Sequence, residues 1–146
     1  MNVLLDTNVL SEARRPAPDL EVLAWLDSVD EDRVFISTAT IAELRRGIAL
    51  MSAGRRRDAL ADWIGNDLPA RFGSRILSID QAIAVRWGDL MAESRRSGKP
   101  LSVMDGFFAA TALAHDLTLV TRNTKDFAPF GIPLFNPWQA YRPESS

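Results

Sequence analysis

The sequence predicts an α/β fold built on a mostly parallel sheet. Short apolar runs recur along the chain, and most are followed by a polar turn and then by the apolar spacing of an amphipathic helix. Strands that alternate with helices in this way form parallel sheets joined by right-handed crossovers. No apolar run approaches the ~18 residues that a membrane-spanning helix needs, so we expect no membrane association.

Length and composition indicate one globular domain. The chain has 146 residues, of which 47% are hydrophobic and 25% charged, and this suits a single core of ordinary size. It contains no cysteine, which excludes disulfides, thiolate metal sites and a cysteine nucleophile. The first residues lack the basic start and apolar core of a signal peptide, so we expect a cytoplasmic protein. The domain is expected over residues 1–138, followed by a polar tail over residues 139–146.

The first elements follow from apolar runs and their breaks. Val3-Leu4-Leu5 is a continuous apolar run, as expected of a strand buried on both faces. Residues 9–13 are expected to form a short helix, which the prolines of Arg14-Arg15-Pro16-Ala17-Pro18 terminate. Apolar spacing then predicts a helix over residues 19–29, and Val34-Phe35-Ile36 predicts a second buried strand.

The middle of the chain predicts three helices and one strand. Apolar spacing indicates helices over residues 41–51 and 55–72, and we expect Pro69 to mark the fraying end of the second. Residues 75–79 form an apolar run that predicts a third strand, which could lie at the edge of the sheet. A long amphipathic helix is expected over residues 80–96.

The last third of the chain predicts a buried helix between strands. The helix that starts at Ser102 is apolar around most of its circumference, which is typical of a buried helix. Residues 117–121 predict a fourth strand. Ile132-Pro133-Leu134-Phe135 predicts a last strand at the sheet edge, because proline is tolerated there and not in a central strand.

Acidic and amide side chains occur where predicted strands end or the next helices begin. Because the carboxyl ends of parallel strands meet at one crevice, we expect these side chains to lie together there. Carboxylates in one crevice raise each other's pKa unless a cation neutralises them, and a site with only oxygen ligands suits Mg²⁺ or Mn²⁺. Such ions activate water and stabilise the leaving oxygen in phosphoryl chemistry. The candidate residues are Asp6, Glu43, Asp105, Asn123 and Asp126.

Each acid also has a structural interpretation. Asp6 could cap the helix that follows the first strand. Thr40-Ile41-Ala42-Glu43 and Ser102-Val103-Met104-Asp105 both match the capping box, in which an acid bonds back to the start of its helix. Ser78-Ile79-Asp80-Gln81 also matches a capping box, so we expect Asp80 to lie outside the site. The single histidine, His115, is expected at a helix end or in the core, without a catalytic role.

The basic residues suggest local phosphate contacts. The net charge of −2 and the pI near 5.4 argue against a protein that binds nucleic acid non-specifically over its whole surface. Apart from Lys99 and Lys125, however, every basic residue is Arg, which binds phosphate through two parallel N–H groups. The alternative is that these arginines lie on solvent-exposed helix faces and form ion pairs with neighbouring Asp and Glu residues. The candidates for substrate binding are Arg14, Arg15, Arg45, Arg46 and Arg122, with Thr7 and Thr121 beside the acids.

Four segments carry a resemblance to a known family. They are Leu4–Glu12, Ile41–Leu44, Asp105–Ala112 and Leu119–Asn123, and the similarity extends from Met1 to Trp138. Together they resemble a PIN domain, and more narrowly the VapC and FitB-like toxins of bacterial type II toxin–antitoxin pairs. The resemblance implies a three-layer α/β/α fold, with a parallel sheet of about five strands in the order 3-2-1-4-5.

The same resemblance implies an activity and partners. It implies a ribonuclease dependent on Mg²⁺ or Mn²⁺, which hydrolyses RNA phosphodiester bonds with metal-activated water and leaves a 5′-phosphate and a 3′-hydroxyl. It implies a homodimer, inhibited by a VapB- or FitA-like antitoxin whose DNA-binding half represses the shared operon. Toxin and antitoxin would then form a heterotetramer or a larger assembly.

The resemblance also implies roles for individual residues. By position, Asp6, Glu43 and Asp105 fall on the acidic metal site of the family, with Asp6 and Asp105 as direct ligands. The fourth position of the family falls on Asn123, where many relatives have Asp. The neutral amide could hold a metal-bound water or the phosphate, and Asp126 could supply the missing charge or cap a short final helix.

Two alternatives of other classes remain open from the sequence. A receiver-like signalling domain also clusters acids around Mg²⁺ at strand ends, but Lys125 lies too far past the fourth strand for the lysine such a domain needs. A non-catalytic binding module with a degenerate metal site is the second alternative, and Asn123 suits it. For the nuclease, mutation of Asp6 or Asp105 to Asn is expected to abolish metal-dependent cleavage and leave the protein folded. Calorimetric titration of Mn²⁺ into the wild type and the Asp6 variant is expected to separate the active enzyme from the binding module.

Overall fold

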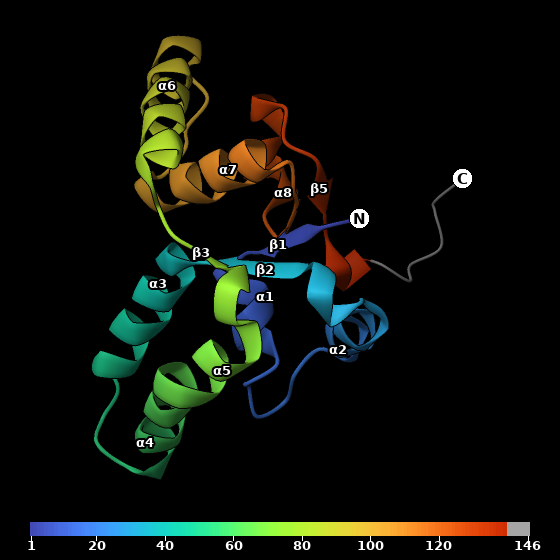
Figure 1. Ribbon diagram of the computed structural model, residues 1–146, viewed down its shortest axis with the longest axis vertical. Helices are drawn as coiled ribbons and strands as arrows, with labels where there is room; N and C mark the ends of the chain where they lie inside the picture. The colour runs from blue at the N-terminus through green and yellow to red at the C-terminus, as the bar shows by residue number, and fades with distance from the viewer. Residues whose placement is uncertain (140–146) are drawn as a thin grey trace.

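The computed structural model describes residues 1–139, which form three layers (Figure 1). A five-stranded parallel sheet has the order β3-β2-β1-β4-β5, so the predicted fold class and strand order are confirmed. The expected polar tail lies, from residue 140 onward, outside the described residues. The strands are β1 (Val3–Leu5), β2 (Val34–Ser37), β3 (Ile76–Leu77), β4 (Thr118–Val120) and β5 (Leu134–Phe135).

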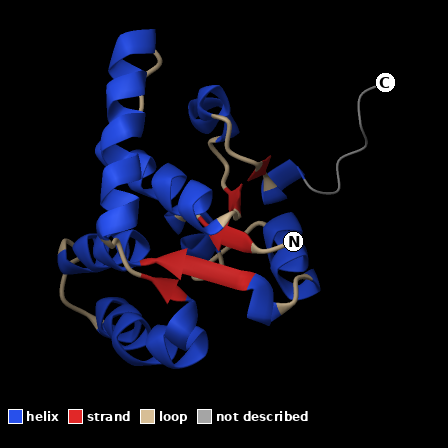
Figure 2. Cartoon of the chain, turned by 45° about the horizontal axis from the view of Figure 1, so that its top comes forward, coloured by secondary structure: helices blue, strands red, loops and turns tan. Residues whose placement is uncertain are grey.

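Helices cover both faces of this sheet. In Figures 1 and 2, helices α1 to α5 lie on one side of the strands, and α6 to α8 lie on the other. No helix among residues 1–139 is long and apolar enough to cross a membrane. The helices are α1 (Thr7–Glu12), α2 (Leu20–Ser28), α3 (Thr38–Ala49), α4 (Arg55–Asp62), α5 (Leu68–Phe72), α6 (Gln81–Ser97), α7 (Val103–His115) and α8 (Thr124–Phe127).

Strand β1 is the centre of the core. Val3 and Leu5 pack into the cluster on the α1 to α5 side, and Leu4 packs into the cluster under α7, because successive side chains of a strand point to opposite faces. All three side chains are essentially inaccessible to solvent, and burying each stabilises the fold by about 1.5–3 kcal/mol. The predicted strand buried on both faces is therefore confirmed, and it delivers Asp6 to the carboxyl end of the sheet.

The helix predicted over residues 55–72 is interrupted by a π-helical turn. Helix α4 passes into a π-helical segment, Trp63–Asp67, and then into α5. The backbone N–H of Leu68 donates to the carbonyl of Trp63, five residues earlier. Pro69 is the second residue of α5, which directly follows this π-helical segment. The helical stretch ends at Phe72, as predicted, and Pro69 lies three residues before that end.

Two of the predicted caps are displaced. Helix α3 starts at Thr38, and the Ser37 hydroxyl accepts a hydrogen bond from the Ala39 N–H at 2.9 Å, so Thr40 and Glu43 do not form the expected capping box. Helix α6 is capped by Asp80, whose carboxylate accepts from the Ile83 N–H at 3.0 Å, rather than by Ser78. In both helices the capping residue is the one whose side-chain oxygen lies closer to the first free backbone N–H groups.

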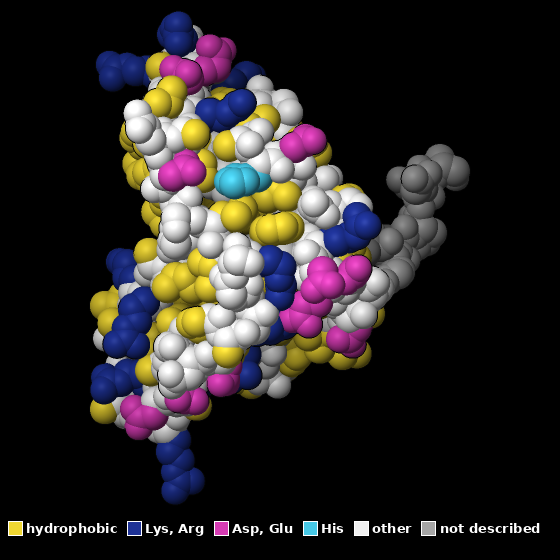
Figure 3. Space-filling view, viewed as in Figure 1, with side chains coloured by type: hydrophobic (Ala, Val, Ile, Leu, Met, Phe, Trp, Pro, Cys, Tyr) yellow, Lys and Arg dark blue, Asp and Glu magenta, His cyan; other side chains and the backbone are white. Residues whose placement is uncertain are grey.

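The remaining expectations for the second half are confirmed. The Ser102 hydroxyl caps α7 by accepting from the Asp105 N–H at 3.1 Å, and the interior of α7 is buried as predicted. Strands β3 and β5 lie at the two edges of the sheet. His115 lies in the last turn of α7 and is exposed, as the single histidine in Figure 3 shows.

Gly106 lies where α7 approaches α6 most tightly. A Cβ on Gly106 would lie 2.8 Å from Sδ of Met91 and 2.9 Å from Cδ1 and Nε1 of Trp87. We therefore expect Gly106→Ala to lower the free energy of unfolding by about 1–3 kcal/mol through overpacking, measured by urea denaturation. Gly88→Ala is the matched control on α6, because nothing lies within 4 Å of its Cβ position. It should raise the free energy of unfolding by up to about 1 kcal/mol, and the prediction is wrong if both variants behave alike.

Candidate active site

An acidic pocket of about 300 Å³ opens at the carboxyl end of β1. Its walls come from the ends of β1 and β4 and from α1, α3 and α7, so segments far apart in the sequence meet there. The structure brings four of the five candidate acidic and amide residues together in this pocket, with Thr7 beside them, while Asp126 does not line it. The lining residues are Asp6, Thr7, Asn8, Ser11, Glu43, Asp105 and Asn123.

Asp6 is a buried carboxylate with a partner on each oxygen. One oxygen, Oδ1, accepts the Thr7 N–H at 2.7 Å, so Asp6 does cap α1, as its structural interpretation predicted. The other oxygen, Oδ2, accepts the Thr121 hydroxyl at 2.7 Å. The Thr121 hydroxyl in turn accepts the Asn123 N–H at 3.1 Å. Capping and membership of the site are therefore compatible, because the cap fixes the orientation of the carboxylate at the pocket.

The pKa of Asp6 is raised from 3.8 to about 6. Burial is the main cause, because it removes water from the charged form, and Asp6 is only 5% exposed. The hydrogen bonds from Thr121 and Thr7 oppose this shift, whereas the negative charges of Asp105 and Glu43 add to it. The apo pocket thus holds a carboxylate at an unfavourable position, which a nearby cation would relieve.

Thr7 links two of the candidate acids. Its backbone N–H bonds to Asp6, and its hydroxyl donates to Oε1 of Glu43 at 2.6 Å. The hydroxyl of Thr40, which is fully buried, lies 3.3 Å from the Thr7 hydroxyl. Glu43 is therefore oriented by a side chain of α1 and not by the start of its own helix.

The charge of Asp126, on α8, acts on Asp105, on α7. Burial raises the pKa of Asp105, a hydrogen bond with Ser102 lowers it, and the charges of Asp126 and Glu43 raise it further. Asp126 lies in the first turn of α8, whose cap position is occupied by Asn123, so the interpretation of Asp126 as that cap is wrong. The Asn123 side chain makes no capping hydrogen bond, and it lines the pocket.

The predicted phosphate-binding arginines lie around this pocket in different settings. Arg14 and Arg15 line a groove of about 230 Å³ that shares Ser11 and Glu43 with the acidic pocket. Figure 3 shows basic side chains gathered along the side of the molecule that α3 and α4 form. The Arg14 guanidinium stacks on the Trp63 ring at 5.1 Å, and Arg15 pairs with the buried Glu12 at 3.1 Å.

Three further arginines were predicted to contact substrate. Arg46 lines a second cavity of about 430 Å³ with Glu43 and Met104, and Arg45 is exposed on α3. The Arg122 guanidinium stacks on the ring of Trp138 at 5.1 Å, next to Asn123 in the chain. The structure thus puts Arg14, Arg15 and Arg46 beside cavities that touch Glu43.

The residues of the pocket fit an open, hydrated cation site rather than a closed cage. Within residues 1–139, no three acidic or histidine side chains lie close enough together to hold a metal ion between them. Mg²⁺ typically takes one or two protein carboxylates and completes its shell with water and substrate phosphate, which Asp6 and Asp105 could satisfy. Asn8 supports this fit, because its buried Oδ1 has no hydrogen-bond partner among the described residues.

Two lining residues, Asn8 and Ser11, were not predicted as site residues. Both follow Asp6 on α1, and they are three positions apart, so they share one face of the helix with each other. The sequence signal that could have identified Asn8 and Ser11 was therefore their helical spacing just after the end of the first strand. It could have been used once α1 was known to begin at Thr7.

Comparison with known proteins identifies the family of this chain. The PIN domain family model matches residues 3–131. The chain is 40% identical to toxin FitB from Neisseria gonorrhoeae over 136 residues, covering 93% of this chain and 98% of the relative. It is 42% identical to VapC ribonuclease Y4jK from Sinorhizobium fredii over 138 residues, covering 94% of this chain and 98% of the relative.

Solved structures of related proteins share the fold of this chain. The crystal structure of FitAcB from Neisseria gonorrhoeae matches with a TM-score of 0.88 and 40% identity, covering 93% of this chain and 98% of that one. A toxin–antitoxin complex from Klebsiella pneumoniae matches with a TM-score of 0.63 and 31% identity, covering 93% and 98%. The chain therefore belongs to the PIN-domain family and, within it, to the group that includes FitB and VapC.

Proposed function

We propose that this protein is a Mg²⁺- or Mn²⁺-dependent endoribonuclease, the toxin of a toxin–antitoxin pair, acting in the cytoplasm. The observation that carries the proposal is the buried Asp6 carboxylate with its raised pKa, in one pocket with Glu43, Asp105 and Asn123. Relatives named ribonuclease and toxin, at 40% identity or more over almost the whole chain, support it. The products would carry a 5′-phosphate and a 3′-hydroxyl.

The chain's own residues would prepare the pocket for an RNA phosphodiester. Asp6 and Asp105 would hold the cation, with Glu43 oriented beside them by the Thr7 hydroxyl. When bound, a divalent cation would supply charge neutralisation and Lewis-acid activation of water for in-line displacement. The Asn123 amide makes no capping bond and would donate to a phosphate oxygen, which suits a neutral group at the fourth position of the family.

The neighbouring arginines would bind the phosphates that flank the scissile bond. Arg46 lines one cavity together with Glu43, and Arg14 and Arg15 line a second groove that also includes Glu43. Guanidinium groups bind phosphate strongly and lose this affinity as salt increases. Local clusters of this kind reconcile RNA binding with the overall charge of −2.

The partners follow from the relatives by similarity. The Klebsiella structure is a toxin–antitoxin complex, and we propose that this chain likewise binds a VapB- or FitA-like antitoxin and forms a homodimer. The groove lined by Arg14, Arg15 and Trp63 shares Ser11 and Glu43 with the acidic pocket. An antitoxin segment in that groove would lie next to the site, which supports inhibition by direct coverage.

The two alternatives are separated by topology and by experiment. The strand order 3-2-1-4-5 differs from the order 2-1-3-4-5 of receiver domains, which removes the first alternative. The second alternative, a binding module with a degenerate metal site, predicts no RNA cleavage under any metal condition. Calorimetric titration with Mn²⁺ and an RNA cleavage assay together distinguish it from the nuclease.

Asp105→Asn tests the proposed function directly. We expect RNA cleavage to fall by about 100-fold or more, because one carboxylate that holds the cation is lost, and we expect chelation of divalent ions to abolish cleavage by the wild type. Asp80→Asn is the matched control, since Asp80 also follows a strand but caps α6 away from the pocket. End analysis of the fragments checks for 5′-phosphates. Full activity of Asp105→Asn, or activity that survives chelation, contradicts the proposal.

A further inference from the structure

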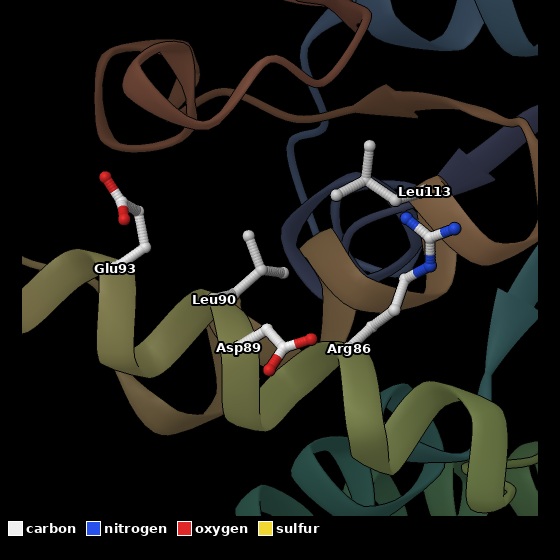
Figure 4. A pocket seen from close by; sticks show the side chains of 5 residues that line it. All are labelled: Arg86, Asp89, Leu90, Glu93 and Leu113. Carbon is white, nitrogen blue, oxygen red and sulfur yellow. The ribbon is translucent and has the colours of Figure 1, made fainter.

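Helix α6 is peripheral, yet it contacts the part of α7 that carries Asp105. Of its 17 residues only Ile83 and Ser94 are buried, so α6 contributes little to the core. Part of the α6–α7 boundary is an open groove of about 410 Å³, lined by four residues of α6 and one of α7 (Figure 4): Arg86, Asp89, Leu90, Glu93 and Leu113. Away from this groove the two helices pack closely, and Met91 and Trp87 of α6 lie against Gly106 of α7.

Trp87 supplies a fixed point beside Asp105. Its indole Nε1 donates to the carbonyl of Val103 at 3.0 Å, in the first turn of α7. Its ring stacks on Phe107, with centroids 5.1 Å apart and planes 15° from parallel. It also touches the Gly106 position so closely that no Cβ fits there. Trp87 therefore contacts residues on both sides of Asp105 without lining the acidic pocket.

The same turn of α7 is also held by its N-cap residue, Ser102. The Ser102 hydroxyl accepts the Asp105 N–H, so the cap orients the backbone at Asp105 from within α7. A helix N-terminus held only by its own cap frays, because its first N–H groups lack partners inside the helix. The indole of Trp87 adds an anchor from a second helix to this turn, in which Val103 is exposed and Asp105 is half-buried.

We propose that Trp87 is a positioning residue for the acidic site, which holds the first turn of α7 so that the Asp105 carboxylate reaches the pocket. The proposal rests on the proposed function for its catalytic consequence. Its structural basis is independent of that function, since it consists of the contacts of Trp87 with Val103, Gly106 and Phe107. Oxygen ligands must be held within about half an ångström of their productive positions, so small shifts of α7 matter.

Trp87→Phe tests this role, because phenylalanine keeps an aromatic ring next to Phe107 but has no N–H for the Val103 carbonyl. We expect kcat for RNA cleavage to fall about tenfold with KM changed less than twofold, since substrate binding groups stay in place. The dissociation constant for Mn²⁺, measured by calorimetry, should rise severalfold. Amide hydrogen exchange of residues 103–107 should become faster in the same variant.

Trp25→Phe is the matched control. Trp25 is also packed on a phenylalanine, Phe135, with centroids 5.2 Å apart, but it lies on α2. If Trp25→Phe and Trp87→Phe change kcat, Mn²⁺ affinity and the urea midpoint in the same proportions, Trp87 is only structural and the proposal is overturned. Unchanged exchange of residues 103–107 in Trp87→Phe overturns it as well.

The proposed function is tested separately by the wild type. A wild-type chain that binds Mn²⁺ but cleaves no RNA refutes the nuclease, while Mn²⁺ affinity and amide exchange in Trp87→Phe still decide the positioning role. A wild-type chain that cleaves RNA and a Trp87→Phe variant with normal kcat refute the positioning role alone. Each result therefore bears on one proposal without depending on the other.

Discussion

Asp6→Asn is expected to abolish RNA cleavage and at the same time to stabilise the apo protein. The raised pKa of Asp6 means that the folded state disfavours the charged carboxylate, and a rise from 3.8 to about 6 corresponds to about 3 kcal/mol. An amide carries no charge, its oxygen can accept the Thr7 N–H, and the Thr121 hydroxyl can accept from its NH₂ group. We expect a gain of about 1–3 kcal/mol in the free energy of unfolding at pH 7.5, measured by urea denaturation with chelator present.

The pH dependence of this gain gives a second readout. Because the folded pKa is raised, the penalty from Asp6 is absent below the unfolded value of 3.8 and is complete above about 6. The difference in stability between the variant and the wild type should therefore grow as the pH rises through this window. Asp19→Asn is the control, since Asp19 also caps a helix, with Oδ1 accepting from the Glu21 N–H at 2.9 Å. A stability gain in Asp19→Asn equal to that of Asp6→Asn would show that the burial of the Asp6 charge is not the cause.

Metal binding is expected to weaken steeply on acidification. A cation in the pocket needs an ionised Asp6, and protons compete for this carboxylate below its pKa of about 6. The pKa of Asp105 is also raised, which adds to the effect. We expect the Mn²⁺ affinity of the wild type to fall by roughly tenfold per pH unit below pH 6, with little change between pH 7 and 8.

Calorimetry between pH 5 and 8 measures this dependence, and cleavage rates at limiting Mn²⁺ should follow the same curve. Asp80→Asn should retain the wild-type profile, because Asp80 caps α6 and does not line the pocket. A constant Mn²⁺ affinity from pH 5 to 7.5 would exclude Asp6 as a group that must lose its proton for binding.

Local patterns in the sequence determine the fold class and the neighbourhood of the site. The continuous apolar run of β1 predicts a strand buried on both faces, since each of its side chains needs an apolar neighbour on its own side. The polar residues after β1 and β4 predict side chains at the carboxyl edge of the sheet, because parallel strands share that edge. These inferences need only periodicity and strand direction, which the sequence contains.

Errors arose where several local solutions were equally good. Thr40 and Glu43 match a capping box, but the Ser37 hydroxyl caps α3 three residues earlier than predicted. Ser78 and Gln81 also match a capping box, but the Asp80 carboxylate caps α6. In both places the residue at which the helix starts depends on how the helix packs on its neighbours. A short segment of sequence does not specify that packing.

The sequence by itself determined which polar side chains gather in the pocket, because Asp6, Glu43, Asp105 and Asn123 were predicted to lie together and all line it. Tertiary structure alone decided how they are held and charged. The Thr121 hydroxyl that bonds to Asp6 lies 115 residues away in the chain, and the Thr7 hydroxyl bonds to Glu43 on another helix. The raised pKa of Asp6 has the same origin, since desolvation depends on every atom packed around the carboxylate and not on its neighbours in sequence.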